Sequence, residues 1–190
     1  MNATPGQTVG PFFGFALPYA GGPELVPPGS VGAVRLTGLV LDGAGAGIPD
    51  AVVEIWQPDP SGALVQRPGS LHRDGWTFTG FGRAGTDNTG RYSFTTLRPG
   101  GIAPFFAVTV FARGLTDRLF TRAYLPGHEE TPFLAGLPSE RRRTLVVAED
   151  GDQLTFDIRL QGHDETVFLE YRIEALPPGS GRAPHGPNRG

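Results

Sequence analysis

The sequence predicts an all-β protein, an antiparallel β-sandwich of about eight strands with an extended N-terminal arm and little helix. Its 190 residues suit one sandwich domain. The 29 Gly and 19 Pro interrupt the chain too often for long helices. Apolar residues, among them 13 Phe, recur in short runs between these interruptions, a pattern typical of strands joined by turns.

The first 31 residues predict an arm and not a flexible linker. They are rich in Gly and Pro, yet they carry aromatic side chains from Phe12 to Tyr19. Flexible linkers seldom hold that much apolar surface, because it has to be covered. We therefore expect residues 1–31 to lie against the chain's own domain or against a partner subunit. Residues 32–176 would then form the sandwich.

Turn residues bound the first predicted strands. Residues 34–41 alternate apolar and polar positions and end at an Asp-Gly turn. Residues 51–57 are rich in β-branched residues and end at a Pro-Asp-Pro-Ser-Gly sequence, while residues 91–97 end at Pro-Gly. The same reasoning gives five further strands, at residues 105–113, 119–124, 144–148, 153–160 and 166–171.

Two segments are expected to lie outside the sheets. A helical turn is predicted at 138–142, where Pro and Ser precede charged residues. The tail at 177–190 consists mainly of Pro, Gly and Arg, so we expect it to be disordered.

Charge and cysteine content exclude several classes of function. The net charge is −3, and the one dense basic cluster is Arg-Arg-Arg at 141–143. A solvated helix end or an ion-pair site explains this cluster, and the basic footprint of a nucleic-acid-binding protein is missing. The absence of Cys excludes disulfides and thiolate sites. Since no signal peptide or membrane-spanning run is visible, we expect a soluble cytoplasmic protein.

The chain lacks the patterns of a self-sufficient catalytic or metal site. Its four His show no His-x-His or His-x3-His spacing, so no strand or helix presents two of them on one face. No Gly-x-Ser-x-Gly motif marks a nucleophile. The Gly-rich stretch 43–47 is followed by a strand and not by a helix, which favours a hairpin connection over a phosphate loop. These features favour a binding module or an accessory subunit.

Short motifs run through the chain in a defined order. They are TPGQTVGPF at 4–12, G-x-V-x-D at 38–42, EIWQ at 54–57, GR at 82–83, GRYSF at 90–94, L-x-PG at 97–100, VFARG at 110–114, TR-x-Y at 121–124 and FDIRLQG at 156–162. Together they resemble the intradiol ring-cleaving dioxygenases, over residues 4 to 171. The arm and the VFARG segment are similar to the α type of subunit in that family. The resemblance implies the same sandwich fold.

The resemblance also implies an iron enzyme in which this chain does not hold the iron. In the family's catalytic β subunit, two Tyr and two His bind Fe(III), and the two His form a His-x-His on one strand. Phe105 and Ala107 stand at the His positions here. No Tyr occurs in 63–80 or 100–104, where the family's Tyr ligands fall. Phenolate and imidazole stabilise a ferric ion by donating charge, which Phe and Ala cannot do. This chain would then have no catalytic and no metal-binding residue.

The implied partner is a homologous iron-binding β subunit, in a hetero-oligomer of αβ units. The implied reaction is the cleavage of protocatechuate by O2 to 3-carboxy-cis,cis-muconate, a step of aromatic catabolism. By the resemblance, the arm reaches the partner's site, so that Thr8, Gly10, Pro11 and Phe12 bind substrate there. Arg113 would stand near the same site, where it could attract an anionic catechol or hold a loop across the interface. An ordinary surface arginine at a strand end is the alternative for Arg113.

Two other interpretations fit parts of the sequence. A stand-alone transthyretin-like module, with a structural or interaction role, fits residues 38–57 but gives no reason for the arm or for the VFARG segment. A self-sufficient dioxygenase for another catechol would need four iron ligands that the sequence does not provide.

Overall fold

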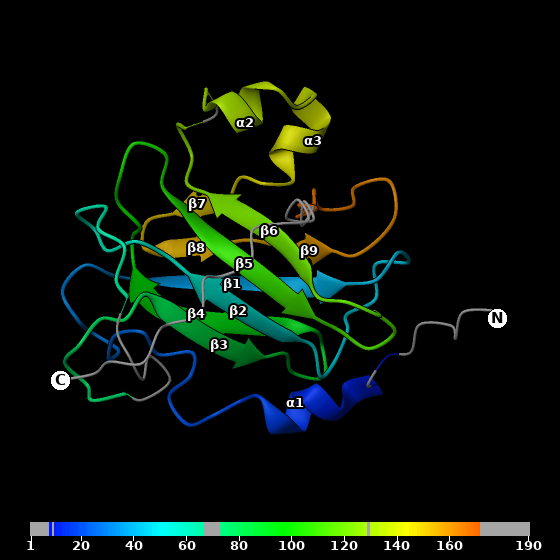
Figure 1. Cartoon of the computed structure of the whole chain (residues 1–190), viewed down its shortest axis with the longest axis horizontal. Coiled ribbons are helices and arrows are strands. Elements are labelled where there is room, and N and C mark those ends of the chain that lie inside the picture. Colours follow the sequence, from blue (N-terminus) through cyan, green and yellow to red (C-terminus); the bar gives the residue numbers. More distant parts are fainter. Residues whose placement is uncertain (1–7, 9, 67–72, 129, 172–190) are drawn as a thin grey trace, which may run out of the picture.

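A computed structural model of the chain describes residues 8, 10–66, 73–128 and 130–171. Two β-sheets face each other, with short helices at opposite ends of the molecule (Figure 1). The predicted sandwich with little helix is confirmed. The first sheet has the order β4 (Arg91–Leu97), β1 (Ala33–Leu41), β8 (Gln153–Thr155) and β7 (Ala148–Asp150), and β9 (Ile158–Arg159) also pairs with β1. The second sheet has the order β3 (Phe81–Gly85), β2 (Val52–Trp56), β5 (Phe105–Phe111) and β6 (Leu119–Tyr124).

The helices of the described residues are only one or two turns long. They are the 3-10 turn η1 (Gly10–Phe12), α1 (Phe13–Ala16), α2 (Pro132–Ala135) and α3 (Ser139–Arg143). The last of these confirms the predicted helical turn at 138–142. Thr131 caps α2, because its hydroxyl accepts a hydrogen bond from the Leu134 N–H at 3.4 Å. Within the described part of the chain, no helix is long and apolar enough to cross a membrane.

The core lies between the two sheets and follows the period-2 pattern of the strands. Phe106, Val108 and Val110 alternate on β5 and are buried, whereas their neighbours on β5 are only partly buried. Leu36 and Phe94 from the facing sheet are fully buried in the same cluster. A second, smaller core cluster of Tyr124, Leu134 and Leu145 lies where α2 meets the sandwich.

Two predicted strands are wrong or incomplete, and one strand was missed. Residues 166–171 form no strand; their backbone bonds to the sheets are isolated, from Thr166 N–H to the Arg159 carbonyl and from Leu169 N–H to the Phe120 carbonyl. Residues 144–148 mostly follow α3 as a loop, and β7 begins only at the last of them. The missed strand is β3, whose two glycines dilute the β-branched pattern on which strand prediction depends.

The pairing around β1 is partly parallel, which differs from the purely antiparallel sandwich that the sequence predicts. The predicted strand 153–160 is divided into β8 and β9, and both pair with β1 in parallel. The cause is the route of the chain, because β7 and β8 form an antiparallel hairpin at the sheet edge. That hairpin brings β8 back beside β1 in the same direction as β1.

Candidate functional site

The first described elements of the arm form a short helical segment that is anchored by one side chain. Phe13 is buried to 9% exposure, and its ring packs against Phe111 at the end of β5 with 6.3 Å between centroids. Phe12 is 70% exposed. The Thr8 hydroxyl accepts a hydrogen bond from the Gly10 N–H at 3.1 Å, and Pro11 lies in η1. The four arm residues that the sequence predicts for substrate binding therefore lie together, just before the buried anchor.

Beyond α1, the arm follows the edge of the second sheet and is bonded to it. The Arg83 side chain of β3 donates a hydrogen bond to the Leu17 carbonyl at 2.8 Å and forms an ion pair with Glu54 of β2 at 2.6 Å. The Tyr19 ring lies 5.7 Å from the Arg83 guanidinium and 5.9 Å from that of Arg73. Such cation–π contacts hold an aromatic side chain on the surface of a sheet. Residues 17–22 are thus held by their own domain.

Arg113 lies at the same end of the molecule as α1, and it forms an ion pair with Asp50. The Asp50 carboxylate accepts hydrogen bonds from both Nε and Nη2 of Arg113, with a distance of 3.2 Å for the Nε bond. These bonds raise the pKa of Arg113 above its usual value. Gly14 of α1 lies directly against the Asp50 backbone, since a Cβ there would come within 2.9 Å of the Asp50 carbonyl oxygen. Asp50 connects Arg113 with the arm, and sequence reasoning gave no sign of it.

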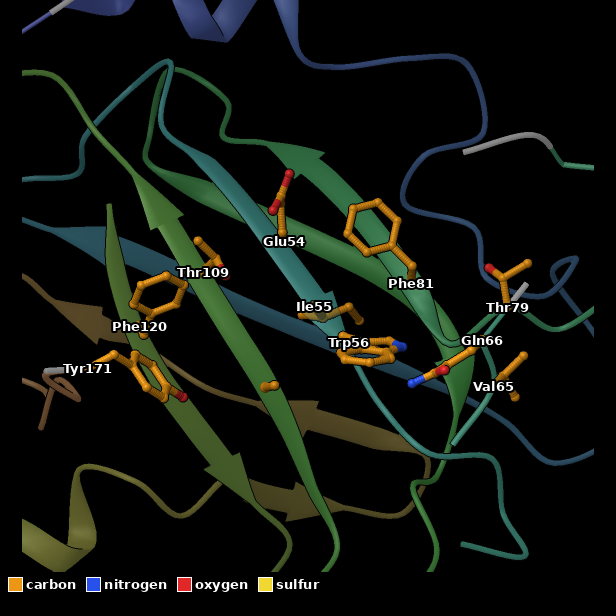
Figure 2. A pocket seen from close by; sticks show the side chains of 11 residues that line it. Glu54, Ile55, Trp56, Val65, Gln66, Thr79, Phe81, Thr109, Phe120 and Tyr171 are labelled. Carbon is orange, nitrogen blue, oxygen red and sulfur yellow. The ribbon is translucent and has the colours of Figure 1, made fainter. Parts of the chain in front are cut away.

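The two positions at which the resemblance expects His ligands, Phe105 and Ala107, lie on the outer face of the second sheet. Ala107 helps to line an open cavity of about 860 Å³ on this face, and Phe105 lines an adjoining one of about 290 Å³. Trp56, Phe120 and Tyr171 belong to both cavities. Figure 2 shows Phe120 and Tyr171 on one side of the larger cavity and Trp56 with Phe81 on the other, with Thr109 between them.

The residues around the larger cavity do not fit a ferric ion. Among the described residues that line it, Glu54 is the one carboxylate and is bound by Arg83, and Tyr171 is the one phenol and packs edge-on against the Phe120 ring at 5.1 Å. The rest of the wall is aromatic, aliphatic, hydroxyl or amide. Among the residues that the structure describes, no group of three or more His, Asp or Glu could hold a metal ion. Over the part of the chain that the structure describes, the site is therefore an apolar cavity whose lining does not suit a ferric ion.

The sequence contains one signal for this cavity. On β5, the residues of both faces are apolar or small, since Phe105, Ala107 and Thr109 alternate with the buried core positions. Strands that are apolar on both faces are typical of sheets covered on both sides. The cavity itself could not be predicted, because residues far apart in the sequence build its wall.

Comparisons with known proteins agree with this architecture. A family model described as "Dioxygenase" matches residues 23–128. The protocatechuate 3,4-dioxygenase alpha chain of Burkholderia cepacia is 36% identical over an alignment of 195 residues, which covers 90% of this chain and 98% of the relative. The beta chain from the same organism is 33% identical over 158 residues, covering 70% of this chain and 66% of the relative.

A solved structure has the same fold. The dioxygenase domain of a dioxygenase carbohydrate-binding protein fusion from Streptomyces sp. SirexAA-E matches with a TM-score of 0.55 and 24% identity, over 74% of this chain and 88% of that one. From the sandwich and the family match, the chain belongs to the intradiol dioxygenase family. Within that family it is a homologue of the alpha chains of protocatechuate 3,4-dioxygenase. The resemblance seen in the sequence is confirmed.

Proposed function

We propose that this chain is the α-type subunit of a protocatechuate 3,4-dioxygenase and completes the substrate pocket of an iron-bearing β partner. The observation that carries the proposal is the pair Phe105 and Ala107 on β5. By the resemblance, these residues stand where the family's catalytic subunits have their His-x-His. The ferric ion would be held by the partner, so the O2-dependent opening of the ring to 3-carboxy-cis,cis-muconate belongs there. This chain would contribute positioning and charge.

The apolar outer face of the second sheet supports a β partner that covers it. Trp56 is 42% exposed and Tyr171 65%, and they adjoin the Phe81 and Phe120 side chains in the same cavity wall. Contiguous exposed apolar surface of this kind marks a protein interface. Two homologous sandwiches can associate around a pseudo-twofold axis and bury equivalent faces. This chain is 33% identical to a beta chain, and that similarity is consistent with a pairing of two homologous sandwiches.

The arm is the part of the chain that we propose to enter the partner's pocket. Thr8, Gly10, Pro11 and Phe12 precede the buried anchor Phe13, and Phe12 is 70% exposed. Gly allows a close approach of the backbone to a flat ring, and Pro limits the freedom of the backbone. An exposed aromatic next to these residues would contact the partner and the substrate ring.

Arg113 is proposed to recognise the carboxylate of protocatechuate. Its side chain is 54% exposed, and a guanidinium presents paired N–H donors that suit a carboxylate. Arg113→Ala is therefore expected to raise the KM of the complex for protocatechuate about tenfold with a smaller change in kcat, because binding is lost and the chemistry is not. Steady-state oxygen uptake measures both constants. Iron content per β subunit should stay the same, and a loss of iron would show that Arg113 supports the partner's metal site instead.

Expression of this chain with and without a β partner tests the proposal as a whole. The partner would be the β chain encoded beside it or, failing that, a related beta chain. Only the co-expressed pair should bind iron, show the colour of tyrosinate-to-iron charge transfer and cleave protocatechuate. Iron in stoichiometric amount and activity in the lone chain would disprove the proposal. A β partner that is equally active without this chain would disprove its role in the pocket.

A further inference from the structure

Asp50 has a backbone conformation that is rare for its residue type. Its φ is +60°, the left-handed region, and among the described residues no other non-glycine has a positive φ. A residue with a Cβ is uncommon there, although Asp and Asn tolerate this region better than most. Residues held in such conformations often serve a function that the surrounding structure enforces.

Hydrogen bonds hold the turn that contains Asp50. The Thr86 N–H donates to the Ala51 carbonyl at 2.8 Å, and the Thr86 hydroxyl donates to the Ile48 carbonyl at 2.8 Å. Both acceptors flank Asp50 within three residues. The carboxylate of Asp50 is therefore presented from a fixed backbone, and its side chain is only 22% exposed.

The Asp50 carboxylate binds the Arg113 guanidinium as a fork. It accepts from Nε and from Nη2, which fixes the plane of the guanidinium as well as its position. An arginine side chain has five N–H groups, so those not bonded to Asp50 can donate to a second acceptor. Without Asp50, the long side chain of a 54% exposed Arg113 would sample many rotamers.

Asp50 also touches the arm. Gly14 of α1 lies so close to the Asp50 carbonyl oxygen and Cβ that an added methyl group would come within 2.9 Å and 3.2 Å of them. One residue thus contacts both elements that the proposed function assigns to the partner's pocket, namely the arm and Arg113.

We propose that Asp50 is a positioning residue for substrate recognition, holding the Arg113 guanidinium beside α1 with its remaining N–H groups directed to the carboxylate of a carboxylated catechol. The proposal rests on the function proposed above. Asp50 touches neither substrate nor iron and acts through Arg113. Its effect is confined to substrates that carry the carboxylate.

Asp50→Asn and Asp50→Gly in the co-expressed complex test the proposal. Asn and Gly both accept a positive φ, so neither variant strains the turn. Each is expected to raise the KM for protocatechuate about fivefold, with a smaller change in kcat. For catechol, which lacks the carboxylate, kcat/KM should change much less. A merely structural role would lower kcat/KM for both substrates together.

Two further variants separate this proposal from the proposed function. Glu149→Gln is the control, because it breaks the comparably exposed Arg98–Glu149 ion pair (2.8 Å) on the other sheet. It should leave the KM and the kcat for protocatechuate unchanged. Adding Asp50→Gly to Arg113→Ala should raise the KM for protocatechuate little further, because Asp50 acts on the substrate only through Arg113. If Arg113→Ala raises KM and the Asp50 variants do not, Asp50 has no positioning role although the proposed function stands. If Arg113→Ala has no effect, the roles proposed for Arg113 and for Asp50 both fail, whereas the co-expression experiment still decides whether this chain completes the partner's pocket. Loss of assembly in both Asp50 variants would also overturn the proposal, since it would assign Asp50 to the fold.

Discussion

Replacing Gly38 by alanine is expected to lower the free energy of unfolding of this chain by about 3 kcal/mol. Gly38 lies within β1, opposite Tyr92 of β4. A Cβ on Gly38 would overlap with the carbonyl oxygen of Phe156. That oxygen is a backbone atom, so it cannot turn away as the end of a flexible side chain could. It also accepts a 2.5 Å hydrogen bond from the buried Tyr92 hydroxyl. Burial raises the pKa of that hydroxyl, which therefore stays protonated and able to donate.

Gly38 is critical because Phe156, which lies against it, belongs to the short break between β8 and β9. The Phe156 N–H donates to the Thr37 carbonyl at 2.8 Å, and the Asp157 carboxylate accepts from the Leu39 N–H at 2.9 Å. A displaced Phe156 would disturb the pairing of β1 with both parallel strands. Urea unfolding of the purified chain measures the loss.

Gly85→Ala is the matched control for this prediction. Gly85 also lies in a strand, but an added Cβ would meet only Pro18 at 3.8 Å and the Ala51 carbonyl oxygen at 4.0 Å. Its effect on the free energy of unfolding should stay below about 1 kcal/mol. Equal stabilities of the two variants would contradict the assignment of Gly38 to a position that only glycine fits.

Strands whose pattern is local could be predicted from the sequence. The bounds of β1, β4 and β6 agree with the predicted runs to within one residue, because alternation and turn residues act over a few positions. The break inside 153–160 could not be predicted. It depends on the close approach of Phe156 to Gly38, a contact between residues far apart in the chain.

The candidate site, too, could be predicted from the sequence only in part. Phe105 and Ala107 could be compared with the family's His positions because they lie between two ordered motifs, at 97–100 and 110–114, and that match remains a prediction. The Asp50–Arg113 ion pair joins residues 63 positions apart, and no local pattern connects them. The proposed roles of Thr8, Gly10, Pro11, Phe12 and Arg113 remain predictions. So does the division into an arm at 1–31, a sandwich at 32–176 and a tail, since residues 1–7, 9 and 172–190 lie outside the described part.

Phe13→Ala is expected to reduce the kcat/KM of the co-expressed complex for protocatechuate about 100-fold, because catalysis is sensitive to small displacements of groups that position the substrate. Phe13 is the one residue of α1 that is buried, through its contact with Phe111. The residues proposed to line the partner's pocket directly precede it. Without this anchor they would lose a fixed starting point on the sandwich. Steady-state oxygen uptake over a range of protocatechuate concentrations gives the value.

The location of Phe13 makes this result specific to the arm. Phe13 belongs to neither core cluster, so the melting temperature and the iron content of the complex should change little. Phe13→Leu retains apolar contact with Phe111 and should recover most of the lost activity. Arg83 would still hold the Leu17 carbonyl in both variants, so the later part of the arm stays on the sheet. An unchanged kcat/KM in Phe13→Ala, with the complex intact, would mean that the partner alone positions the arm. A complex that falls apart would instead assign Phe13 to assembly.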